Sequence, residues 1–129
     1  MRRYALIIVS DSFYHSPTIV DSERIEHFWR MDSAYLTEWE WEPRDKWFLK
    51  DVNNKKIAFI AGLASLDGRD QIGFINGRHR TRWLLNKGIK ELPVCIPTNE
   101  LEAWMERDLI IQTKQPIVFP EISKLIMQY

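Results

Sequence analysis

The stretch Phe74–Ile96, FINGRHRTRWLLNKGIKELPVCI, limits the possible folds of this chain most, because two glycines divide it into three elements. An apolar strand pattern reaches Gly77, a helical pattern follows as far as Gly88, and the apolar run Val94–Ile96 ends the stretch. Glycine favours sharp turns before a helix and left-handed positions after one. The sequence therefore predicts a strand, a helix over residues 79–87 and a second strand in close succession.

Apolar runs and alternating patterns elsewhere in the chain predict further strands and helices. Residues 10–20 are rich in Ser, Asp and Pro, and we expect them to form a loop. Asp67 and Gly68 are a hairpin signal between two of the strands. We therefore expect a small α+β domain, a mixed sheet with helices, that spans residues 1–129. The expected strands are 4–9, one within 37–49 that Pro43 ends or marks as an edge strand, 56–63, 71–75 and 116–119. The expected helices are 22–36 (capped by Asp21 or Ser22), one that opens with a capping box of Asn99 and Glu102, and one that begins at Pro120.

The composition argues against several classes of protein. The 129 residues include 18 basic and 18 acidic side chains, which argues against a nucleic-acid-binding surface that covers the whole molecule. The single cysteine, Cys95, excludes an internal disulfide and fits a reducing cytoplasm. No run approaches the roughly 18 apolar residues of a membrane span. We expect a cytoplasmic protein without membrane contact, in which any anion binding comes from a local cluster of residues.

The start of the predicted helix after Gly77 has the properties of an anion site. A glycine at this turn lets a ligand approach the backbone, and the first amides of a helix lack intrahelical partners. The helix dipole adds positive charge at the same end. Arg78 and Arg80 can each present two donors to phosphate oxygens, and His79 can donate a hydrogen bond or a proton. Arg82, one turn into the helix, is expected to be peripheral. The residues predicted to bind phosphate are Asn76, Gly77, Arg78, His79, Arg80 and Thr81.

This concentration of positive charge is unfavourable unless another charge compensates it. The dipole opposes each cation at a helix N-terminus by about 0.3–1 kcal/mol. A bound anion would offset this cost, and we prefer this interpretation. In the alternative, Arg78 and Arg80 pair with carboxylates of the chain itself, such as Asp67, Asp70 or those of residues 38–42.

Other reactive or aromatic residues have simpler interpretations. Cys95 lies in an apolar strand without a basic neighbour, so we expect a buried, inert thiol. The histidines lack the helical spacing of a metal site, and we predict no metal-ligating residues among them. Trp39 and Trp41 alternate with three glutamates, which predicts a strand with a solvated acidic face. The six tryptophans are expected mostly in the core, with base stacking as the alternative.

The sequence between Phe74 and Ile96 resembles the phosphate-binding segment of the ParB/sulfiredoxin superfamily. Its members have a strand, a glycine followed by polar and basic residues, a short helix, a connection of the form Gly-hydrophobic-Lys-Glu-hydrophobic-Pro, and a strand. ParB proteins have Gly-Glu-Arg-Arg and sulfiredoxins have Gly-Cys-His-Arg where this chain has GRHR, residues 77–80. The segment Gly88–Val94, GIKELPV, matches the connection. The version GRHRTRW is most similar to small plasmid fertility-inhibition proteins of this superfamily.

The resemblance implies a ParB/sulfiredoxin-like α+β fold that holds nucleotide phosphates at the start of the helix. It also implies interference with conjugative DNA transfer, and relatives are credited with ATPase or DNase activity. Arg78 stands at the position of the sulfiredoxin catalytic cysteine, so we do not expect sulfinic-acid reduction. The same residue replaces the acidic residue of the ParB pattern, which argues against CTP hydrolysis of the ParB type.

Three functions are compatible with these residues and with the resemblance. The first is binding of the phosphate of ATP, of another nucleotide or of nucleic acid, with or without hydrolysis. His79 and Arg80 are then the catalytic candidates, and Mg²⁺ is a candidate cofactor that Asp67 and Asp70 would help to hold. The second is a non-enzymatic module that inhibits a protein of a DNA-transfer or secretion machine through arginine and aromatic side chains. The third is binding of single-stranded nucleic acid by arginine and tryptophan.

Overall fold

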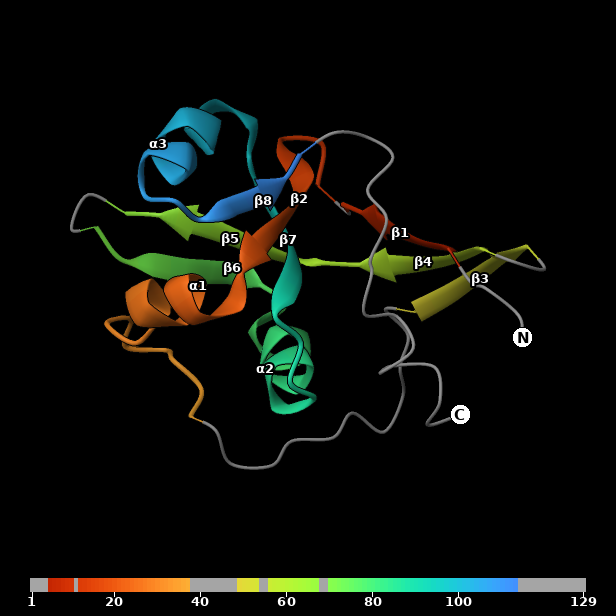
Figure 1. The fold of residues 1–129 in the computed structure, drawn as a ribbon, viewed down its shortest axis with the longest axis horizontal. Coiled ribbons are helices and arrows are strands. Elements are labelled where there is room, and N and C mark those ends of the chain that lie inside the picture. Colours follow the sequence, from red (N-terminus) through yellow and green to blue (C-terminus); the bar gives the residue numbers. More distant parts are fainter. Residues whose placement is uncertain (1–4, 11, 38–48, 54–55, 68–69, 114–129) are drawn as a thin grey trace.

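The computed structural model describes residues 5–10, 12–37, 49–53, 56–67 and 70–113. These residues form an α+β fold, as predicted, in which a five-stranded mixed sheet packs against three α-helices (Figure 1). A smaller three-stranded sheet extends from one end of the large one. In chain order the elements are β1 (Ala5–Val9), β2 (His15–Asp21), α1 (Ser22–Trp29), β3 (Leu49–Asn53), β4 (Lys56–Ile60), β5 (Gly62–Leu66), β6 (Ile72–Asn76), α2 (Arg78–Asn86), β7 (Glu91–Pro97), the 3-10 helix η1 (Thr98–Glu100), α3 (Leu101–Glu106) and β8 (Ile110–Gln112).

The five-stranded sheet has the strand order β6-β5-β7-β2-β8, with β7 in the middle. Strand β7 pairs in parallel with β5 and antiparallel with β2. Its residues Leu92–Ile96 are all buried, which explains why this part of the sequence is a continuous apolar run and does not alternate. Strand β5 returns to β6 through the predicted hairpin, in which the Asp67 amide donates to the Gln71 carbonyl at 2.9 Å.

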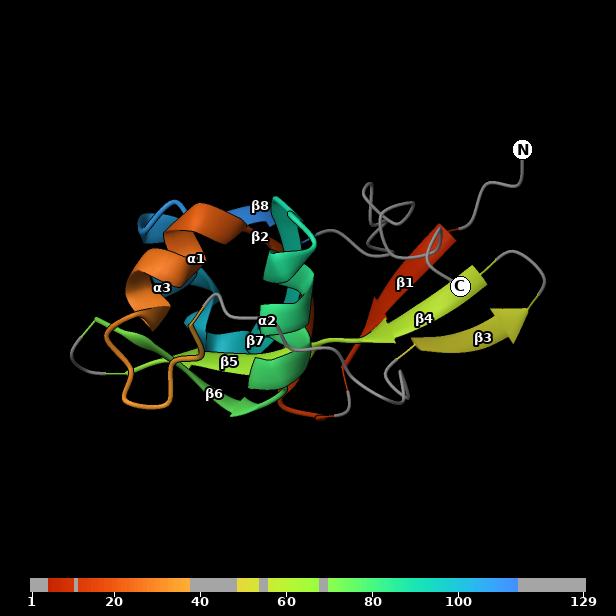
Figure 2. The ribbon, with the colours of Figure 1, turned by 90° about the horizontal axis from the view of Figure 1, so that it is seen from below.

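The two sheets share one continuous length of chain. Strand β4 lies between β1 and β3 in the small sheet, parallel to β1 and antiparallel to β3. Only Ala61, which is buried, separates β4 from β5, so the chain passes directly from one sheet into the other (Figure 2). The sequence predicts a single strand over 56–63 here, whereas the structure has two strands that extend to Leu66.

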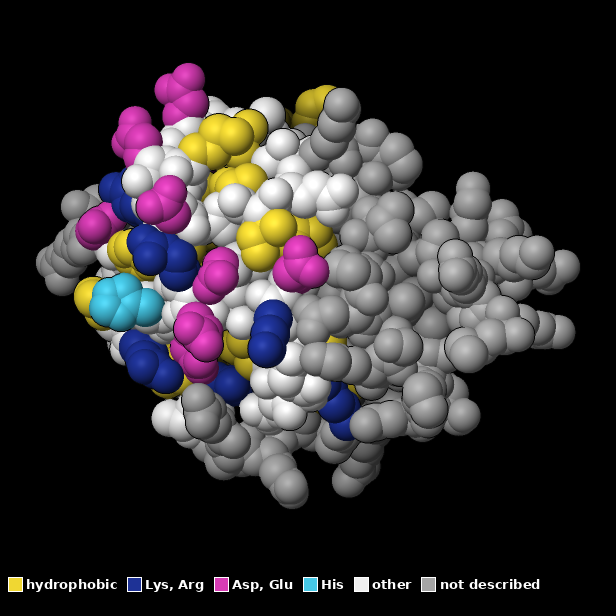
Figure 3. Space-filling view, in the orientation of Figure 1, with side chains coloured by type: hydrophobic (Ala, Val, Ile, Leu, Met, Phe, Trp, Pro, Cys, Tyr) yellow, Lys and Arg dark blue, Asp and Glu magenta, His cyan; other side chains and the backbone are white. Residues whose placement is uncertain are grey.

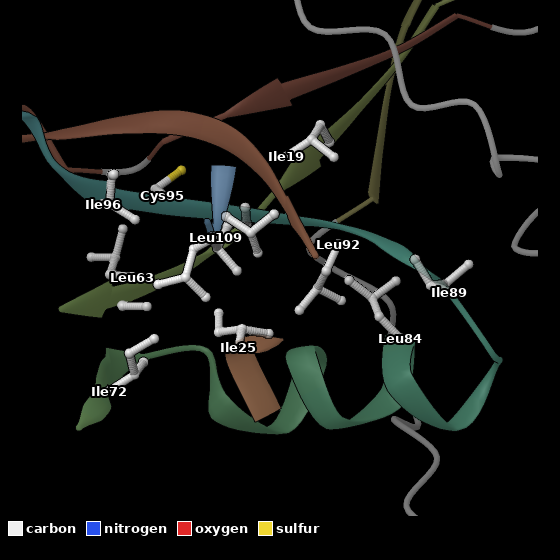
Figure 4. Close-up of a cluster of buried hydrophobic side chains, with 14 of the residues drawn as sticks. Ile19, Ile25, Leu63, Ile72, Leu84, Ile89, Leu92, Cys95, Ile96 and Leu109 are labelled. Carbon is white, nitrogen blue, oxygen red and sulfur yellow. The ribbon is translucent and has the colours of Figure 1, made fainter. Parts of the chain in front are cut away.

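The helices lie on both sides of the large sheet. In Figure 1, α2 lies below the sheet and α3 above it. Ile25 from α1, Leu84 from α2, Leu92 from β7 and Leu109 gather between helices and strands (Figure 4). Burial of a side chain of this size contributes about 1.5–3 kcal/mol, so these contacts hold α1 and α2 against the strands. The tryptophans that the structure describes are buried, as expected for core residues: Trp29, Trp83 and Trp104.

The segment 10–20 is not the loop that its composition predicts. Most of it forms β2, which pairs with β7 along its whole length. Thr18, Ile19 and Val20 are buried, and such β-branched side chains favour a strand. Among the described strands, only β7 pairs with β2 at Pro17, because β8 pairs only with Ile19 and Val20. Pro17 has no backbone N–H to donate to a strand on the other side, so it is tolerated there.

Helix α1 is shorter than the predicted helix over 22–36. Asp21 caps it as predicted, by accepting a hydrogen bond from the Arg24 amide at 3.0 Å. The helix ends after eight residues, and the chain then turns back toward it. This return is held by the Tyr35 hydroxyl, which donates to the Glu26 carboxylate at 2.8 Å. Tertiary contacts therefore decide where the helix ends.

The predicted capping box of Asn99 and Glu102 is wrong. The 3-10 helix η1 comes first, and α3 begins after Glu100 without a side-chain cap. The Glu100 carboxylate accepts hydrogen bonds from the Leu66 amide at 2.9 Å and from the Trp104 indole at 3.1 Å. It thus joins the start of α3 to the end of β5. The short strand β8 has no counterpart among the predicted elements.

Several predicted features lie outside the described residues. These are the strand predicted within 37–49, of which nearly all is undescribed, with Trp39, Trp41 and the acidic face, and the elements at 116–119 and after Pro120. Among the residues that the structure does describe, no helix is both long enough and apolar enough to cross a membrane.

Candidate functional site

The predicted anion site lies where β6 passes into α2. Gly77 is the N-cap of α2 with φ 86° and ψ 16°, a left-handed conformation that glycine adopts without strain. Glycine offers no side chain to cap the amides of the first turn, and that turn contains no acidic residue. The positive end of the helix dipole is therefore not neutralised by the helix's own first residues.

The predicted phosphate-binding residues divide into two groups by exposure. Asn76, Arg78 and His79 are exposed. Arg80 and Thr81 are buried, with exposed fractions of 3% and 1%. A ligand that arrives from solvent meets the first group, and the second group lies beneath it.

Arg80 packs against the backbone of Gly77. A Cβ atom placed on Gly77 would lie 2.5 Å from Nε and 2.8 Å from Nη2 of Arg80. The guanidinium therefore occupies the space where any other residue at position 77 would have its side chain. All three guanidinium nitrogens are buried. This packing makes Arg80 a residue that positions the loop, and its contact with phosphate stays a prediction.

Thr81 and Gly62 fix the same loop from inside the protein. Thr81 Oγ1 donates to the Gly77 carbonyl at 2.8 Å, and the Thr81 amide donates to the same oxygen at 3.0 Å. A Cβ atom on Gly62 would lie 2.9 Å from Thr81 Oγ1 and 3.0 Å from the Gly77 oxygen. The absence of a side chain at Gly62 thus lets β5 approach the start of α2 closely.

Arg82 forms a buried ion pair that joins α2 to α1. Its Nη1 atom lies 2.6 Å from Oε2 of Glu26 and donates to the Leu36 carbonyl at 3.2 Å. Its Nε atom donates to Oδ1 of Asn86 at 3.1 Å. From the sequence we expect Arg82 at the periphery of the anion site. The ion pair has no signal in the sequence, because Glu26 and Arg82 lie far apart in the chain. Its role is to connect two helices.

Glu26 is ionised in this pair over a wider pH range than an ordinary glutamate. Burial raises the pKa of its carboxyl, but hydrogen bonds from Arg82 and Tyr35 lower it. The positive charges of Arg82 and Arg30 lower the pKa further, and the net result is a pKa below the ordinary value. The carboxylate therefore remains a charged partner for Arg82 at neutral pH.

A groove of about 440 Å³ lies beside this ion pair, between α1 and the C-terminal half of α2. Glu26, Arg82 and Asn86 are among its walls. None of the described residues 76–81 lines it, so the groove is separate from the predicted anion site.

Of the carboxylates that could pair with Arg78 and Arg80, one has another partner. Asp70 forms an ion pair with Arg107. Residues 38–42 lie outside the described residues. Within the described part of the chain, no cluster of three or more His, Cys, Asp or Glu side chains could hold a metal ion. Help from Asp67 and Asp70 in holding Mg²⁺ stays a prediction. Cys95 is completely buried, as predicted.

Fold and site together define an α+β protein with a basic, glycine-capped helix start that solvent can reach. The family model of plasmid fertility inhibition factors matches residues 17–109, which is more than half of the chain. The protein therefore belongs to the plasmid fertility inhibition factor family. No match was found among curated proteins or among solved structures. Membership of the wider ParB/sulfiredoxin superfamily stays a prediction.

Proposed function

We propose that this protein inhibits the conjugative transfer of plasmid DNA and that it binds the phosphate of a nucleotide or of nucleic acid at the start of α2. Inhibition of plasmid fertility is the property that names its family. One observation carries the proposed phosphate site. The exposed Arg78 and His79 follow a left-handed Gly77, at the positive end of a helix whose first turn has no acidic residue.

The local charge at this helix end is unfavourable without an anion. Each exposed cation there opposes the dipole by about 0.3–1 kcal/mol at low ionic strength. On the face of the molecule shown in Figure 3, acidic and basic side chains are interspersed. A bound phosphate would turn the unfavourable contribution of the exposed Arg78 into a favourable one.

The residues of the proposed site have different roles. Arg78 offers two parallel donors to phosphate oxygens, and the amides of the first turn offer more. His79 donates a hydrogen bond, and it protonates the leaving oxygen if the bound nucleotide or DNA is hydrolysed. Arg80 and Thr81 hold the loop from beneath. ATP is the first nucleotide to test, with and without Mg²⁺.

Thermal melting tests phosphate binding directly. The purified protein is melted with ATP, CTP, GTP, inorganic phosphate or a short single-stranded oligonucleotide, each with and without Mg²⁺. A ligand at 100 times its Kd stabilises the folded state by about 2.7 kcal/mol, which raises the melting temperature by several degrees. We expect this shift in the wild type and its loss in the double variant Arg78→Ala, His79→Ala. The control is Arg30→Ala, which removes an arginine that is 58% exposed at the end of α1 and should keep the shift.

A mating assay then decides whether phosphate binding is needed for inhibition. Donor cells that carry a conjugative plasmid and produce each variant are mated with recipients, and the transfer frequency is counted. We expect the wild type and Arg30→Ala to lower the frequency and the Arg78, His79 double variant to restore it. A double variant that keeps the full ligand-induced melting shift would overturn the phosphate site.

A non-enzymatic inhibitor that contacts a protein of a DNA-transfer or secretion machine is the second candidate. The burial of Arg80 and Thr81 favours it, because two of the six predicted phosphate ligands are not accessible to solvent. In that case no phosphate ligand shifts the melt, and the double variant Arg78→Ala, His79→Ala still inhibits transfer.

A further inference from the structure

The turn between β1 and β2 presents two aromatic side chains to solvent. Phe13 is 95% exposed and Tyr14 is 78% exposed, the highest values among the large apolar residues that the structure describes. Their rings meet edge to face, with centroids 5.6 Å apart. Turns favour Gly, Asn, Asp and Ser, and an exposed ring gains almost nothing from burial in the fold. Stability of the folded chain therefore gives no reason for aromatic residues here.

A set of hydrogen bonds holds this turn in one conformation. The Ser10 hydroxyl donates to the Ser12 carbonyl at 2.9 Å, and the Ser12 amide donates to the Ser10 hydroxyl at 3.1 Å. Ser12 Oγ lies 2.7 Å from Nδ1 of His15. The Thr98 amide donates to the Tyr14 carbonyl at 3.1 Å, which ties the turn to the start of η1. The rings are therefore carried by a fixed backbone and not by a free loop.

A rigid backbone matters for binding because fewer degrees of freedom remain to be lost. Phe and Tyr also have only two side-chain torsions each, so they bury a large area at a low entropic cost. Uncharged polar residues adjoin the turn: Thr98 donates its amide to the Tyr14 carbonyl, and its hydroxyl is hydrogen-bonded to that of Ser16 at 2.7 Å. Fixed aromatics on a turn that is rich in Ser and Thr are typical of loops that recognise proteins.

We propose that the aromatic turn, residues 12–14, is a docking surface for a protein of the conjugation machinery, and that Phe13 and Tyr14 insert into an apolar cleft of that protein. This proposal rests on the proposed function in one respect: the partner is assumed to be a protein of the conjugation machinery because the chain is proposed to inhibit conjugation. Nucleic acid is disfavoured as the partner, because residues 10–20 contain no Lys or Arg and contain Asp11, which lies outside the described residues.

The aromatic turn and the proposed phosphate site lie apart in the fold. In Figure 1 the connection from β1 to β2 lies above the large sheet, whereas α2 lies below it. The turn also precedes residues 17–109, the part of the chain that matches the family. Changes at one surface therefore leave the contacts of the other intact.

A double variant, Phe13→Ala with Tyr14→Ala, tests the docking surface. Because both rings are exposed, its melting temperature should stay within a few degrees of the wild type. In the mating assay we expect transfer to rise about tenfold or more over donors that produce the wild type, as for truncated interface hot spots. The matched control is Ile111→Ala, an exposed apolar residue of β8, which should inhibit transfer like the wild type. Full inhibition by the double variant would overturn the proposal.

Photo-crosslinking identifies what touches the turn. A photoreactive phenylalanine analogue replaces Phe13 in donor cells with and without the conjugative plasmid. We expect an adduct with a protein that the plasmid encodes, and only in cells that carry it. An adduct with nucleic acid, or none in cells where the wild type inhibits transfer, overturns the proposal. An adduct with a second copy of the chain also overturns the proposal, if light scattering shows that the wild type is a dimer and that the double variant is not.

The two proposals fail in distinguishable ways. If the variant of Phe13 and Tyr14 inhibits transfer fully while the variant of Arg78 and His79 does not, the docking surface alone is wrong. If the reverse holds and no phosphate ligand shifts the melt, the phosphate site alone is wrong. If the wild type does not lower the transfer of any conjugative plasmid tested, both proposals are wrong.

Discussion

At position 77 a side chain would be unfavourable for two separate reasons, the backbone conformation and the lack of space. Gly77 has a φ of 86°, which lies in the left-handed region, where an L-residue costs roughly 1–2 kcal/mol. Its missing Cβ also leaves the space in which the Arg80 guanidinium and the Cα of Gly62 lie, each within 2.5 Å of where that atom would be. The backbone conformation and the packing of the helix start therefore depend on the same residue.

We expect Gly77→Ala to lower the free energy of unfolding by about 3–5 kcal/mol, because the backbone cost adds to the displacement of Arg80. Gly88→Ala is the matched control. Gly88 also has a positive φ, of 76°, but a Cβ atom there meets nothing within 4 Å. It should lose only the backbone term of about 1–2 kcal/mol. Urea denaturation measures both, and equal losses would show that the contact between Gly77 and Arg80 adds nothing to stability.

The basic residues around Gly77 show how far sequence reasoning reaches at single positions. The left-handed glycine and the helix start follow from the local sequence, because they depend on neighbours in the chain. The burial of Arg80 and Arg82 does not follow, since it depends on Gly62 and Glu26, which are distant in sequence. Arg80 and Arg82 are two residues apart, and this spacing does not indicate that Arg80 packs on Gly77 whereas Arg82 pairs with Glu26.

At the scale of elements, α1 and α2 are linked by the ion pair of Glu26 and Arg82. The Glu26 side chain is mostly buried and that of Arg82 almost completely so. The removal of one partner from a buried pair leaves a desolvated charge without compensation, which is more costly than the loss of a surface pair. The pair therefore makes the position of α2 against α1 sensitive to the charge of one carboxyl group.

The pH dependence of stability tests this link. The pKa of Glu26 is lower in the folded protein than its ordinary value of 4.5, so the folded state favours the ionised form. The resulting stabilisation is fully present above the unfolded-state pKa and is lost as the pH falls through the lower, folded-state pKa. We expect the free energy of unfolding of the wild type to fall more steeply than that of Glu26→Gln between about pH 5 and pH 3.

The two unfolding curves should therefore converge at low pH and differ most near neutrality. Glu102→Gln serves as the control, because it removes an exposed carboxylate of α3. Its curve should run parallel to that of the wild type. A constant difference between wild type and Glu26→Gln at all pH values would show that the ionisation of this group does not contribute.

The elements that sequence reasoning predicts best are those defined by local chemistry. Strand β1 is a continuous apolar run, and the hairpin around Asp67 and the helix from Gly77 to Gly88 combine apolar patterns with turn residues at their ends. Strand β2 is missed because Pro17 and its polar neighbours are typical of a loop, and only pairing with β7 makes a strand there. Strand β8 is missed because three residues form it through contacts with β2 alone.

At the scale of the whole molecule, the central strand of the five-stranded sheet and the end of β4 in the three-stranded sheet contribute to one hydrophobic core. Strand β7 lies between β5 and β2, and its residues Leu92–Ile96 are all buried. Phe59 and Ile60, at the end of β4, belong to the same hydrophobic cluster as β7. The direct passage from β4 into β5 therefore couples the small sheet mechanically and energetically to the large one.

Native-state hydrogen exchange measures this coupling. We expect the amides of Val94–Ile96 to exchange only through global unfolding, and those of Phe59 and Ile60 to open with the same free energy. The amides of Ile110–Gln112 in the edge strand β8 should open at a free energy lower by about 2 kcal/mol or more, because they are held by one neighbouring strand. Val94→Ala should lower the opening free energy of both sheets equally, by about 1–3 kcal/mol, because it creates a cavity in the shared core. If β4 instead opens in much less denaturant than β7, and Val94→Ala leaves its exchange unchanged, the two sheets unfold as separate units and the continuous strand does not couple them.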